Sequence, residues 1–242
     1  MILVTGAAGK TGRAVTAALA ARGAAVRALV RRPVVAPMLV AAGAREVVVG
    51  DLEHERDLMT ACTGVTAIYH ICPNLHPGEV EIARLLMGCA EATGVRRLVY
   101  HSVLHPQTEA MPHHWRKLRV EELLFTRVLD WTILQPAAYY QNLLAYWPAI
   151  AATGVYAPPY APATRLGMVD LEDVAEVAAR VLTGPGHAGA TYELVGGAGL
   201  TQVHIANVIA AELGRPVRAE AADRTAWARQ VAVQGMDAGA DV

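Results

Sequence analysis

The chain has 242 residues, of which 54% are hydrophobic and 18% are charged, and its formal net charge is −1. This composition is typical of a folded globular protein, and it excludes disorder and a polyanion-binding surface as the main function. Cys62, Cys72 and Cys89 form no CxxC pair, which predicts buried or free thiols in a reducing compartment. No signal-peptide pattern and no long apolar run are present, so we expect a cytoplasmic protein without a membrane span.

Short apolar runs alternate with helical patterns through the first part of the chain. In chain order, we expect strand 2–4, helix 13–22, strand 26–30, a helix to residue 43, strand 47–49, helix 58–62, strand 67–70, helix 80–93, strand 97–101, helix 115–127 and strand 131–134. Strands that alternate with helices predict βαβ units, and continuous apolar strands predict a sheet covered on both faces. The fold class is therefore α/β, with a doubly wound parallel sheet.

The character of the sequence changes after Gln135, where prolines interrupt a stretch rich in Tyr and Trp. Helices are expected at 171–182 and 202–213, with a strand at 191–195 between them. These elements are too few for an independent sheet. We therefore expect residues 1–135 to form the core. Residues 136–242 should form a small α/β lobe that packs on the core, belongs partly to the same domain and makes one wall of a cleft. The last residues, 235–242, lack apolar periodicity and are expected to fray.

Three glycines, Gly6, Gly9 and Gly12, separate the first strand from the first helix in the sequence VTGAAGKTGRAV. Gly6 would permit a tight turn, Gly9 the approach of a pyrophosphate to the helix N-terminus, and Gly12 close packing of helix and strand. In this βαβ context the loop, which also contains Lys10 and Thr11, predicts a dinucleotide site of the Rossmann type. A glycine-rich turn without a ligand is the alternative.

The end of the second strand, RALVRRP, discriminates between two dinucleotides. An acidic residue would bond the ribose 2′-hydroxyl of NAD, whereas arginine accommodates a 2′-phosphate. Arg31 and Arg32 stand here, which favours NADP(H), with a solvated basic turn as the alternative. Asp51, after the third strand, is expected either to contact the adenine or to serve as a helix N-cap or turn residue.

The glycine loop, Arg31 and the segments HSVLHP, HHWRKLRVEELL and WTILQPAAYYQN together resemble the NmrA-like branch of the short-chain dehydrogenase/reductase superfamily. The later segments GMVDLEDVAEVAARVLT and YELVGGAGLTQVHIANVIAAELGRPV are similar to the C-terminal half of the same family. The resemblance implies a Rossmann fold with a small C-terminal lobe, and NADP(H) bound at the loop and Arg31. Some members are NAD(P)H:quinone or similar reductases, and others are redox-sensing regulators without evident turnover.

The superfamily's usual Tyr–x–x–x–Lys pair is absent, because Gly6 and His113 stand four residues before the chain's two lysines, Lys10 and Lys117. His113–x–x–x–Lys117 resembles the NmrA-like variant of the pair, and the spacing puts both residues on one helix face. The resemblance gives Lys117 the nicotinamide ribose, while a neutral His113 could take part in proton transfer. The alternative is a solvated helix face on which Lys117 pairs with Glu121.

Ser102 follows the fifth strand, at the edge where open α/β sheets bind ligands. The resemblance implies that it polarises a substrate carbonyl, and a turn or cap hydroxyl is the alternative. Strand alternation places His101 on the face opposite Ser102. The histidines of this region show no recognised metal-ligand spacing, so we expect no metal.

A cluster of aromatic and amide side chains follows the sixth strand. Tyr139, Tyr140, Asn142 and Trp147 predict a flat wall that binds a small planar or aromatic substrate, and a core-packing cluster is the alternative.

These features predict an NADPH-dependent oxidoreductase that transfers hydride to a quinone or a similar conjugated carbonyl compound. Quinone reduction does not strictly need a strong protein acid, because solvent can supply the protons. The alternative is a non-catalytic sensor in which bound NADP(H) changes the affinity for a regulatory protein partner. A near-neutral chain without a basic helix–turn–helix argues against nucleic acid. A homodimer is compatible with either hypothesis.

Overall fold

The computed structural model describes residues 1–223 and residue 225. Within them a parallel sheet of seven strands has the order β10-β6-β5-β4-β1-β2-β3. The strands are β1 (Ile2–Val4), β2 (Val26–Val30), β3 (Glu46–Val49), β4 (Ala67–His70), β5 (Arg97–His101), β6 (Asp130–Pro136) and β10 (Ala190–Leu194). Because β1 lies between β2 and β4, the chain reverses its direction of winding there, which creates the switch point typical of dinucleotide-binding folds.

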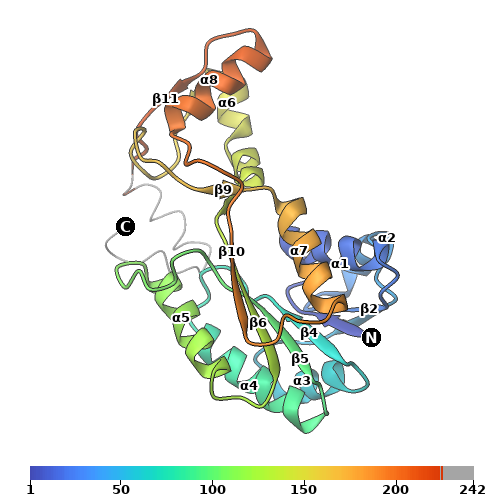
Figure 1. Cartoon of the computed structure of the whole chain (residues 1–242). Coiled ribbons are helices and arrows are strands. Elements are labelled where there is room, and N and C mark those ends of the chain that lie inside the picture. Colours follow the sequence, from blue (N-terminus) through green and yellow to red (C-terminus); the bar gives the residue numbers. More distant parts are fainter. Residues whose placement is uncertain (224, 226–242) are drawn as a thin grey trace.

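Helices cover both faces of this sheet (Figure 1). One layer consists of α1 (Lys10–Ala21), α2 (Ala36–Ala41), preceded by the short η1 (Pro33–Val35), and α7 (Leu171–Thr183). The other consists of α3 (Glu55–Cys62), α4 (Glu79–Ala92) and α5 (Pro112–Leu124). Alternate strand residues feed two cores: Val4, Tyr69 and Val99 pack toward α1 and α7, whereas Leu3 and Tyr100 pack toward the α3–α5 layer. The prediction of a doubly covered α/β sheet is confirmed.

Three helices begin three residues earlier than predicted; one is α3, which begins at Glu55 instead of Leu58, and the other two have identifiable reasons. The first helix begins at Lys10 instead of Arg13, because Gly9 is already its N-cap. The fifth begins at Pro112 instead of Trp115, since proline fits the first turn of a helix, where its missing N–H needs no partner. His113 therefore lies in the first turn of α5.

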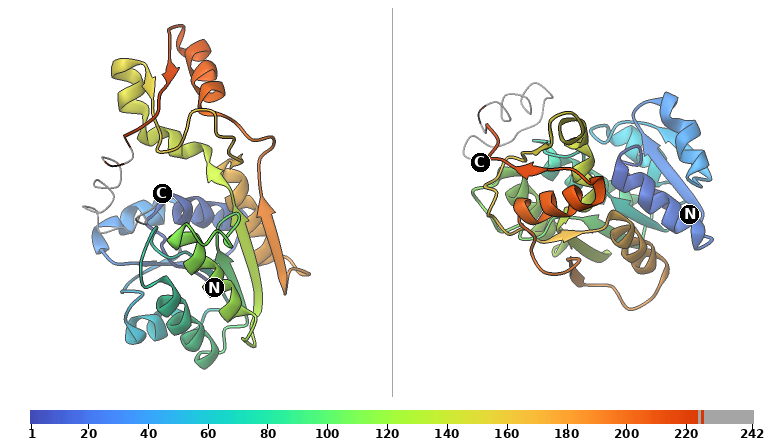
Figure 2. Two further views of the ribbon diagram at one scale, coloured as in Figure 1. Left: turned by 90° about the vertical axis from the view of Figure 1, so that its left-hand side faces the viewer. Right: turned by 90° about the horizontal axis from the view of Figure 1, so that it is seen from above.

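The chain after β6 divides its elements between the sheet and a small lobe, which stands over the carboxyl ends of the strands (Figures 1 and 2). The elements of the lobe are β7 (Ala138–Tyr139), η2 (Tyr140–Ala145), α6 (Trp147–Thr153), β8 (Val155–Tyr156), β9 (Met168–Val169), α8 (Gln202–Leu213) and β11 (Arg218–Ala219). Ile150, Tyr156 and Ile205 lie at the centre of the lobe's own apolar core.

The strand expected at 191–195 is β10, and it pairs with β6 at the edge of the main sheet. Together with α7, which packs in the same core as α1, it returns residues 171–194 to the core. The expected fraying of residues 235–242 lies outside the described residues. In the part of the chain that the structure describes, no helix combines the length and apolar character needed to cross a bilayer.

Candidate active site at the carboxyl edge of the sheet

The glycine loop between β1 and α1 has a backbone that side chains would obstruct. Gly6 has φ +57°, and an added Cβ would lie 2.9 Å from the carbonyl oxygen of Ile71. A Cβ on Gly12 would lie 2.5 Å from Ala7 Cα and closer still to the carbonyl of Gly6. Both clashes involve backbone, which cannot move aside. The tight turn predicted at Gly6 is therefore present, whereas Gly12 packs closely against the loop residues Gly6 and Ala7 and not against the strand itself.

Gly9 has a different environment, which leaves room for a ligand. The nearest atom to an added Cβ would be the Gly6 carbonyl oxygen at 3.3 Å. Gly9 is the N-cap of α1, no side chain caps the helix there, and its first turn contains no acidic residue. The N–H groups of this turn and the positive end of the helix dipole favour an anion. The loop thus fits the pyrophosphate of a dinucleotide.

The basic residues after β2 are exposed at the same edge of the sheet. Arg31 and Arg32 are both exposed immediately after Val30. Arg13, which the sequence interpretation did not single out, extends from α1 to within 3.3 Å of the Met38 sulfur on α2. A third guanidinium group therefore lies between α1 and α2. The sequence feature that could have indicated Arg13 is its position one helical turn after Gly9.

Asp51 has the turn contacts that were its alternative interpretation. Its carboxylate accepts a hydrogen bond of 3.1 Å from the backbone N–H of Glu53, and its own N–H donates to the Asp57 carboxylate at 2.9 Å. The adenine contact proposed for Asp51 remains a prediction.

Lys117 forms a buried ion pair with a residue that the sequence interpretation missed. Its ammonium group lies 2.7 Å from a carboxylate oxygen of Glu79, the first residue of α4, and 3.2 Å from the carbonyl oxygen of His101. The Glu79 side chain is 2% exposed and also accepts a hydrogen bond of 2.9 Å from the Tyr100 hydroxyl. An ammonium group has three donors, so Lys117 retains capacity for a ribose hydroxyl.

Glu121 is not the surface partner of Lys117, and that alternative is wrong. Its carboxylate is buried and accepts a hydrogen bond from the Ser102 hydroxyl. The Gln135 side-chain amide donates to both carboxylate oxygens, at 2.9 and 3.0 Å. Burial raises the pKa of Glu121, and the Ser102 and Gln135 hydrogen bonds offset part of that rise. Ser102 itself is 2% exposed, and its proton is committed to Glu121.

His113 lies one helical turn before Lys117, in the first turn of α5. Its ring packs edge-on against His114, with 4.5 Å between the ring centroids. The Nδ1 atom of His114 is in turn 3.0 Å from the carbonyl oxygen of His105. The ammonium group of Lys117 is directed to Glu79 on α4 and to the carbonyl oxygen of His101 on β5.

His101 is the centre of a second polar network, on the opposite side of the sheet edge from Ser102. Its Nδ1 lies 2.6 Å from the Tyr69 hydroxyl and its Nε2 lies 2.6 Å from the Tyr139 hydroxyl. Burial raises the pKa of Tyr139, and the hydroxyl of Thr11, in the first turn of α1, offsets part of that rise. Strand register contained the signal, because Tyr69 pairs with Val99, and His101 two residues later lies on the same face.

The residues after β6 divide between the glycine loop and the small lobe. Lys10 donates a hydrogen bond to the Asn142 side-chain oxygen, and its ammonium group lies 5.5 Å from the centre of the Tyr139 ring. Tyr140 packs instead against the apolar core of the lobe, which was its alternative interpretation. Trp147 begins α6 and is 43% exposed. The residues predicted to form one aromatic wall therefore divide into two groups. Tyr139 and Asn142 contact Lys10 next to the glycine loop, whereas Tyr140 and Trp147 belong to the small lobe.

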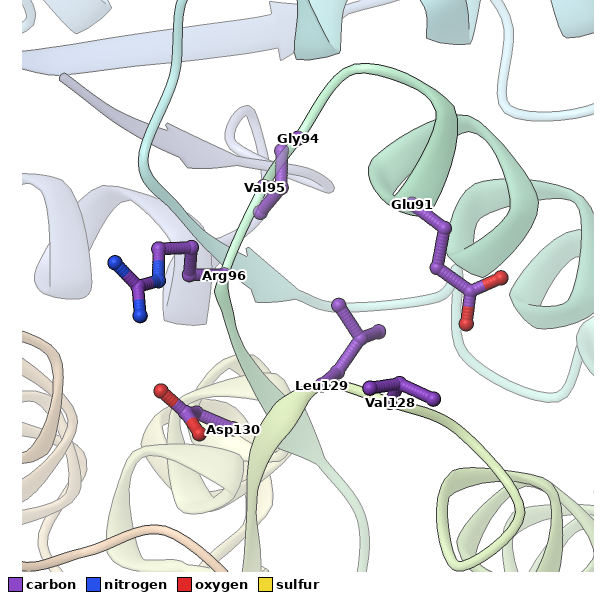
Figure 3. Close-up of a pocket in the computed structure, with 7 residues that line it drawn as sticks. All are labelled: Glu91, Gly94, Val95, Arg96, Val128, Leu129 and Asp130. Atoms are coloured by element: carbon purple, nitrogen blue, oxygen red, sulfur yellow. The ribbon is translucent and has the colours of Figure 1, made fainter.

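Figure 3 shows a surface hollow at the other end of the sheet, before the amino ends of β5 and β6. It is lined by Glu91, Gly94, Val95, Arg96, Val128, Leu129 and Asp130. Open parallel sheets bind ligands at their carboxyl edge, so we do not place the active site there. Among residues 1–223 and 225, no group of three or more His, Cys, Asp or Glu side chains could hold a metal ion.

Strand order, switch point and glycine loop define this chain as a dinucleotide-binding protein of the Rossmann type. The model of the NmrA-like family matches residues 1–238, and the chain belongs to that family.

Two curated relatives and one crystal structure illustrate the similarity. The chain is 31% identical over 220 residues to the NAD(P)H azoreductase of Xenophilus azovorans, covering 90% of this chain and 76% of that protein. It is 30% identical over 221 residues to Quinone oxidoreductase 2 of Escherichia coli, with the same coverage of 90% and 76%. The crystal structure of the NADPH-dependent quinone oxidoreductase of Escherichia coli, complexed with NADPH, has a TM-score of 0.82 at 28% identity, covering 98% of this chain and 83% of that one.

Proposed function

We propose that this protein is an NADPH-dependent oxidoreductase that reduces a quinone or a similar conjugated, planar carbonyl compound. The observation that carries the proposal is the glycine loop: Gly6 and Gly12 are sterically obligatory, and Gly9 opens an uncapped helix N-terminus. The relatives support the substrate class, since one is a quinone oxidoreductase and another an azoreductase. The exposed pair Arg31 and Arg32 supports NADPH over NADH.

The residues that would hold the cofactor divide by the group they bind. The backbone of the glycine loop, with Lys10 and Thr11, would bind the pyrophosphate. Arg31 and Arg32, with Arg13 beside them, would bind the 2′-phosphate, because a planar guanidinium group donates two parallel hydrogen bonds to phosphate oxygens. Bound NADPH supplies the hydride. Lys117 would use its remaining donor on the nicotinamide ribose, and Asp51 would contact the adenine.

The substrate would lie between the carboxyl edge of the sheet and the small lobe. Tyr139 and Asn142 approach this region from the core side, where Lys10 contacts both. Tyr140 and Trp147 would complete the aromatic contacts from the lobe. His113 and Ser102 would be polar groups near the substrate, as the family resemblance implies. Turnover in the cytoplasm, where NADPH is abundant and thiols stay reduced, is consistent with three buried free cysteines.

The first test measures cofactor discrimination. Replacing Arg31 and Arg32 by Ala together should raise the Kd for NADPH at least about 10-fold and leave the Kd for NADH within about threefold, because only NADPH has the 2′-phosphate. The charge-matched control replaces Arg45 and Arg56, which are also exposed, and should change neither value. Equal weakening of both cofactors in the Arg31/Arg32 variant would contradict the 2′-phosphate assignment.

The second test measures turnover. Wild-type protein should oxidise NADPH in the presence of 1,4-benzoquinone or 1,4-naphthoquinone at a rate well above the protein-free reaction. A protein that binds NADPH tightly but consumes none with any quinone, azo or enone acceptor would overturn the enzymatic proposal.

One observation favours a second function, an NADP(H)-binding regulator without turnover. Ser102 and Lys117 stand where the superfamily has catalytic groups, yet both donate to buried carboxylates, Glu121 and Glu79. A regulator predicts that NADP⁺ and NADPH change the affinity for a protein partner to different extents. Absence of turnover together with such a difference would favour this second function.

A further inference from the structure

We propose that Tyr139 donates the proton to the substrate oxygen, and that His101 and Tyr69 orient the Tyr139 hydroxyl for this task. The inference deepens the proposed function and rests on it. Tyr139 is a phenol at the carboxyl edge of the sheet, in a chain that lacks the Tyr–x–x–x–Lys pair. In this network Tyr139 is the proposed catalytic residue, and His101 and Tyr69 are positioning residues.

The hydrogen bond between Tyr69 and His101 determines which ring nitrogen of His101 carries the proton. Tyr69 is completely buried, and its hydroxyl lies 2.6 Å from Nδ1 of His101. A buried hydroxyl must donate its proton to an acceptor, because an unsatisfied buried donor costs about 1–3 kcal/mol. Nδ1 of His101 is therefore the acceptor and carries no proton.

The neutral state of His101 then places its single proton on Nε2. Burial lowers the pKa of His101 to about 3, and the positive charge of Lys117 contributes to this decrease. A neutral imidazole has one N–H group, and Nδ1 is already an acceptor. The Nε2–H group must donate to the Tyr139 oxygen, 2.6 Å away.

This arrangement leaves the proton of Tyr139 unused by the histidine. A phenol has one donor and two acceptor positions, and His101 occupies one acceptor position. The Thr11 hydroxyl lowers the pKa of Tyr139, which is the effect of a group that favours the phenolate. The Tyr139 proton is therefore available to a substrate oxygen.

Two other donors at this edge are directed to buried carboxylates, and the donor that Lys117 retains is the one assigned above to the nicotinamide ribose. The Ser102 hydroxyl donates to Glu121, and the Lys117 ammonium group donates to Glu79. Tyr139, in contrast, is only partly buried, and its ring lies under the Lys10 ammonium group beside the glycine loop. A substrate oxygen next to this loop could therefore accept a hydrogen bond from Tyr139, whereas the Ser102 proton is already donated to Glu121.

The proton transfer balances the proposed reaction. Bound NADPH would supply the hydride, which would form a bond to an atom of the conjugated acceptor, and the displaced π-electron pair would accumulate on the acceptor's carbonyl oxygen. The O–H bond of Tyr139 would break, and a new O–H bond would form on that oxygen. The Tyr139 phenolate would keep the hydrogen bond from Nε2 of His101 and would be reprotonated by water. Burial raises the pKa of Tyr139 to about 12, so the hydroxyl is protonated at neutral pH before each turnover.

The first experiment needs no cofactor and no turnover. In ¹⁵N NMR spectra of the histidine-labelled protein, His101 should show a protonated Nε2 and an unprotonated Nδ1 at neutral pH. Tyr69→Phe removes the hydroxyl that donates to Nδ1 and should shift the ring toward the Nδ1–H tautomer. A wild-type protein in which His101 carries its proton on Nδ1 would overturn the inference, because Tyr139 would then donate to His101.

The second experiment measures kcat with 1,4-benzoquinone and the Kd for NADPH. Tyr139→Phe should lower kcat at least about 10-fold; general acids contribute about 100-fold or more, but water can replace part of this effect for a quinone oxygen. The Kd for NADPH should stay within about twofold. Tyr69→Phe should also lower kcat, because the Tyr139 proton would then be used on His101.

A matched control exists in a tyrosine–histidine pair away from this site. The hydroxyl of Tyr192, a residue of the edge strand β10, lies 2.9 Å from Nδ1 of His187, and Tyr192→Phe should leave kcat unchanged. If wild-type protein turns over and Tyr139→Phe retains its kcat, this inference fails and the proposed function stands. If the wild type binds NADPH but reduces no acceptor, the proposed function fails and this role fails with it.

Discussion

The two sides of the sheet's carboxyl edge satisfy their buried polar groups in different ways. On the α4/α5 side, two carboxylates, Glu79 and Glu121, are buried among donors from Tyr100, Lys117 and Ser102. On the α1/α7 side, the network of Tyr69, His101 and Tyr139 contains no carboxylate.

The difference shows what a buried charge costs the residues around it. A buried carboxylate is strongly destabilising unless donors surround it, so neighbouring N–H and O–H groups must donate to it. A chain of two hydroxyls and one neutral imidazole has three donor protons but only two internal hydrogen bonds, so one proton remains available for another acceptor. In this protein the charged side holds Ser102 and Lys117, and the proposed proton donor Tyr139 lies on the side without a carboxylate.

Among single substitutions at neutral pH, the largest effect is expected from removing the cation on the charged side. Lys117→Ala leaves Glu79, whose side chain is 2% exposed, without its counter-ion, and should lower the free energy of unfolding by about 3–5 kcal/mol in urea denaturation. Adding Glu79→Gln to this variant should restore part of the loss. Arg119→Ala, which breaks an exposed pair with Glu122 on the same helix, should cost less than about 1 kcal/mol. A loss of turnover in Lys117→Ala alone is thus no measure of ribose binding.

The next prediction is a pH dependence of stability, to which one buried histidine on each side of the edge contributes. Burial lowers the pKa of His101 and of His70 to about 3, below the ordinary value of 6.5. The unfolded chain therefore binds more protons between these values, and stability falls as the pH drops from about 6.5 toward 3, by about 1.4 kcal/mol per pH unit for each histidine.

Urea denaturation at a series of pH values checks this slope. His101→Gln should lower this slope by about 1.4 kcal/mol per pH unit, the contribution of one proton, because glutamine does not titrate. Glu121 acts in the opposite direction: its raised pKa makes the folded protein bind more protons, so its contribution weakens as the pH rises from the ordinary glutamate value through the raised one. An acid slope unchanged in His101→Gln would show that His101 is charged in the folded protein.

The smallest effect is expected from the serine. Ser102→Ala removes one donor from Glu121 but leaves both hydrogen bonds of Gln135, so the cost should be about 1–2 kcal/mol at neutral pH. Because the Ser102 hydrogen bond lowers the pKa of Glu121, its loss should raise that pKa further. Thr60→Ala, an exposed helical hydroxyl, should change stability by less than about 0.5 kcal/mol. A Ser102→Ala variant as stable as this control would contradict the buried-donor role.

Most of the fold follows from local sequence patterns. The predicted bounds of β4 and β5 match the structure, because a short apolar run between turn signals in a βαβ series is the length of a strand and too short for a helix. The sequence patterns did not predict that α5 begins at Pro112 or that β10 belongs to the main sheet. The pattern of a single strand does not indicate which neighbouring strand it pairs with.

What the sequence alone determined is the sheet, its glycine loop and the family, because each depends on residues close together in the chain. Gly6, Gly9 and Gly12 act within one turn, and Arg31 directly follows the strand beside it. What only the tertiary structure decided is which remote side chains contact one another at the site. Glu79 meets Lys117 across 38 positions, and Tyr139 meets His101 across another 38. Hydrogen bonds depend on distances of a few tenths of an ångström between such remote residues, and no spacing along the chain encodes them.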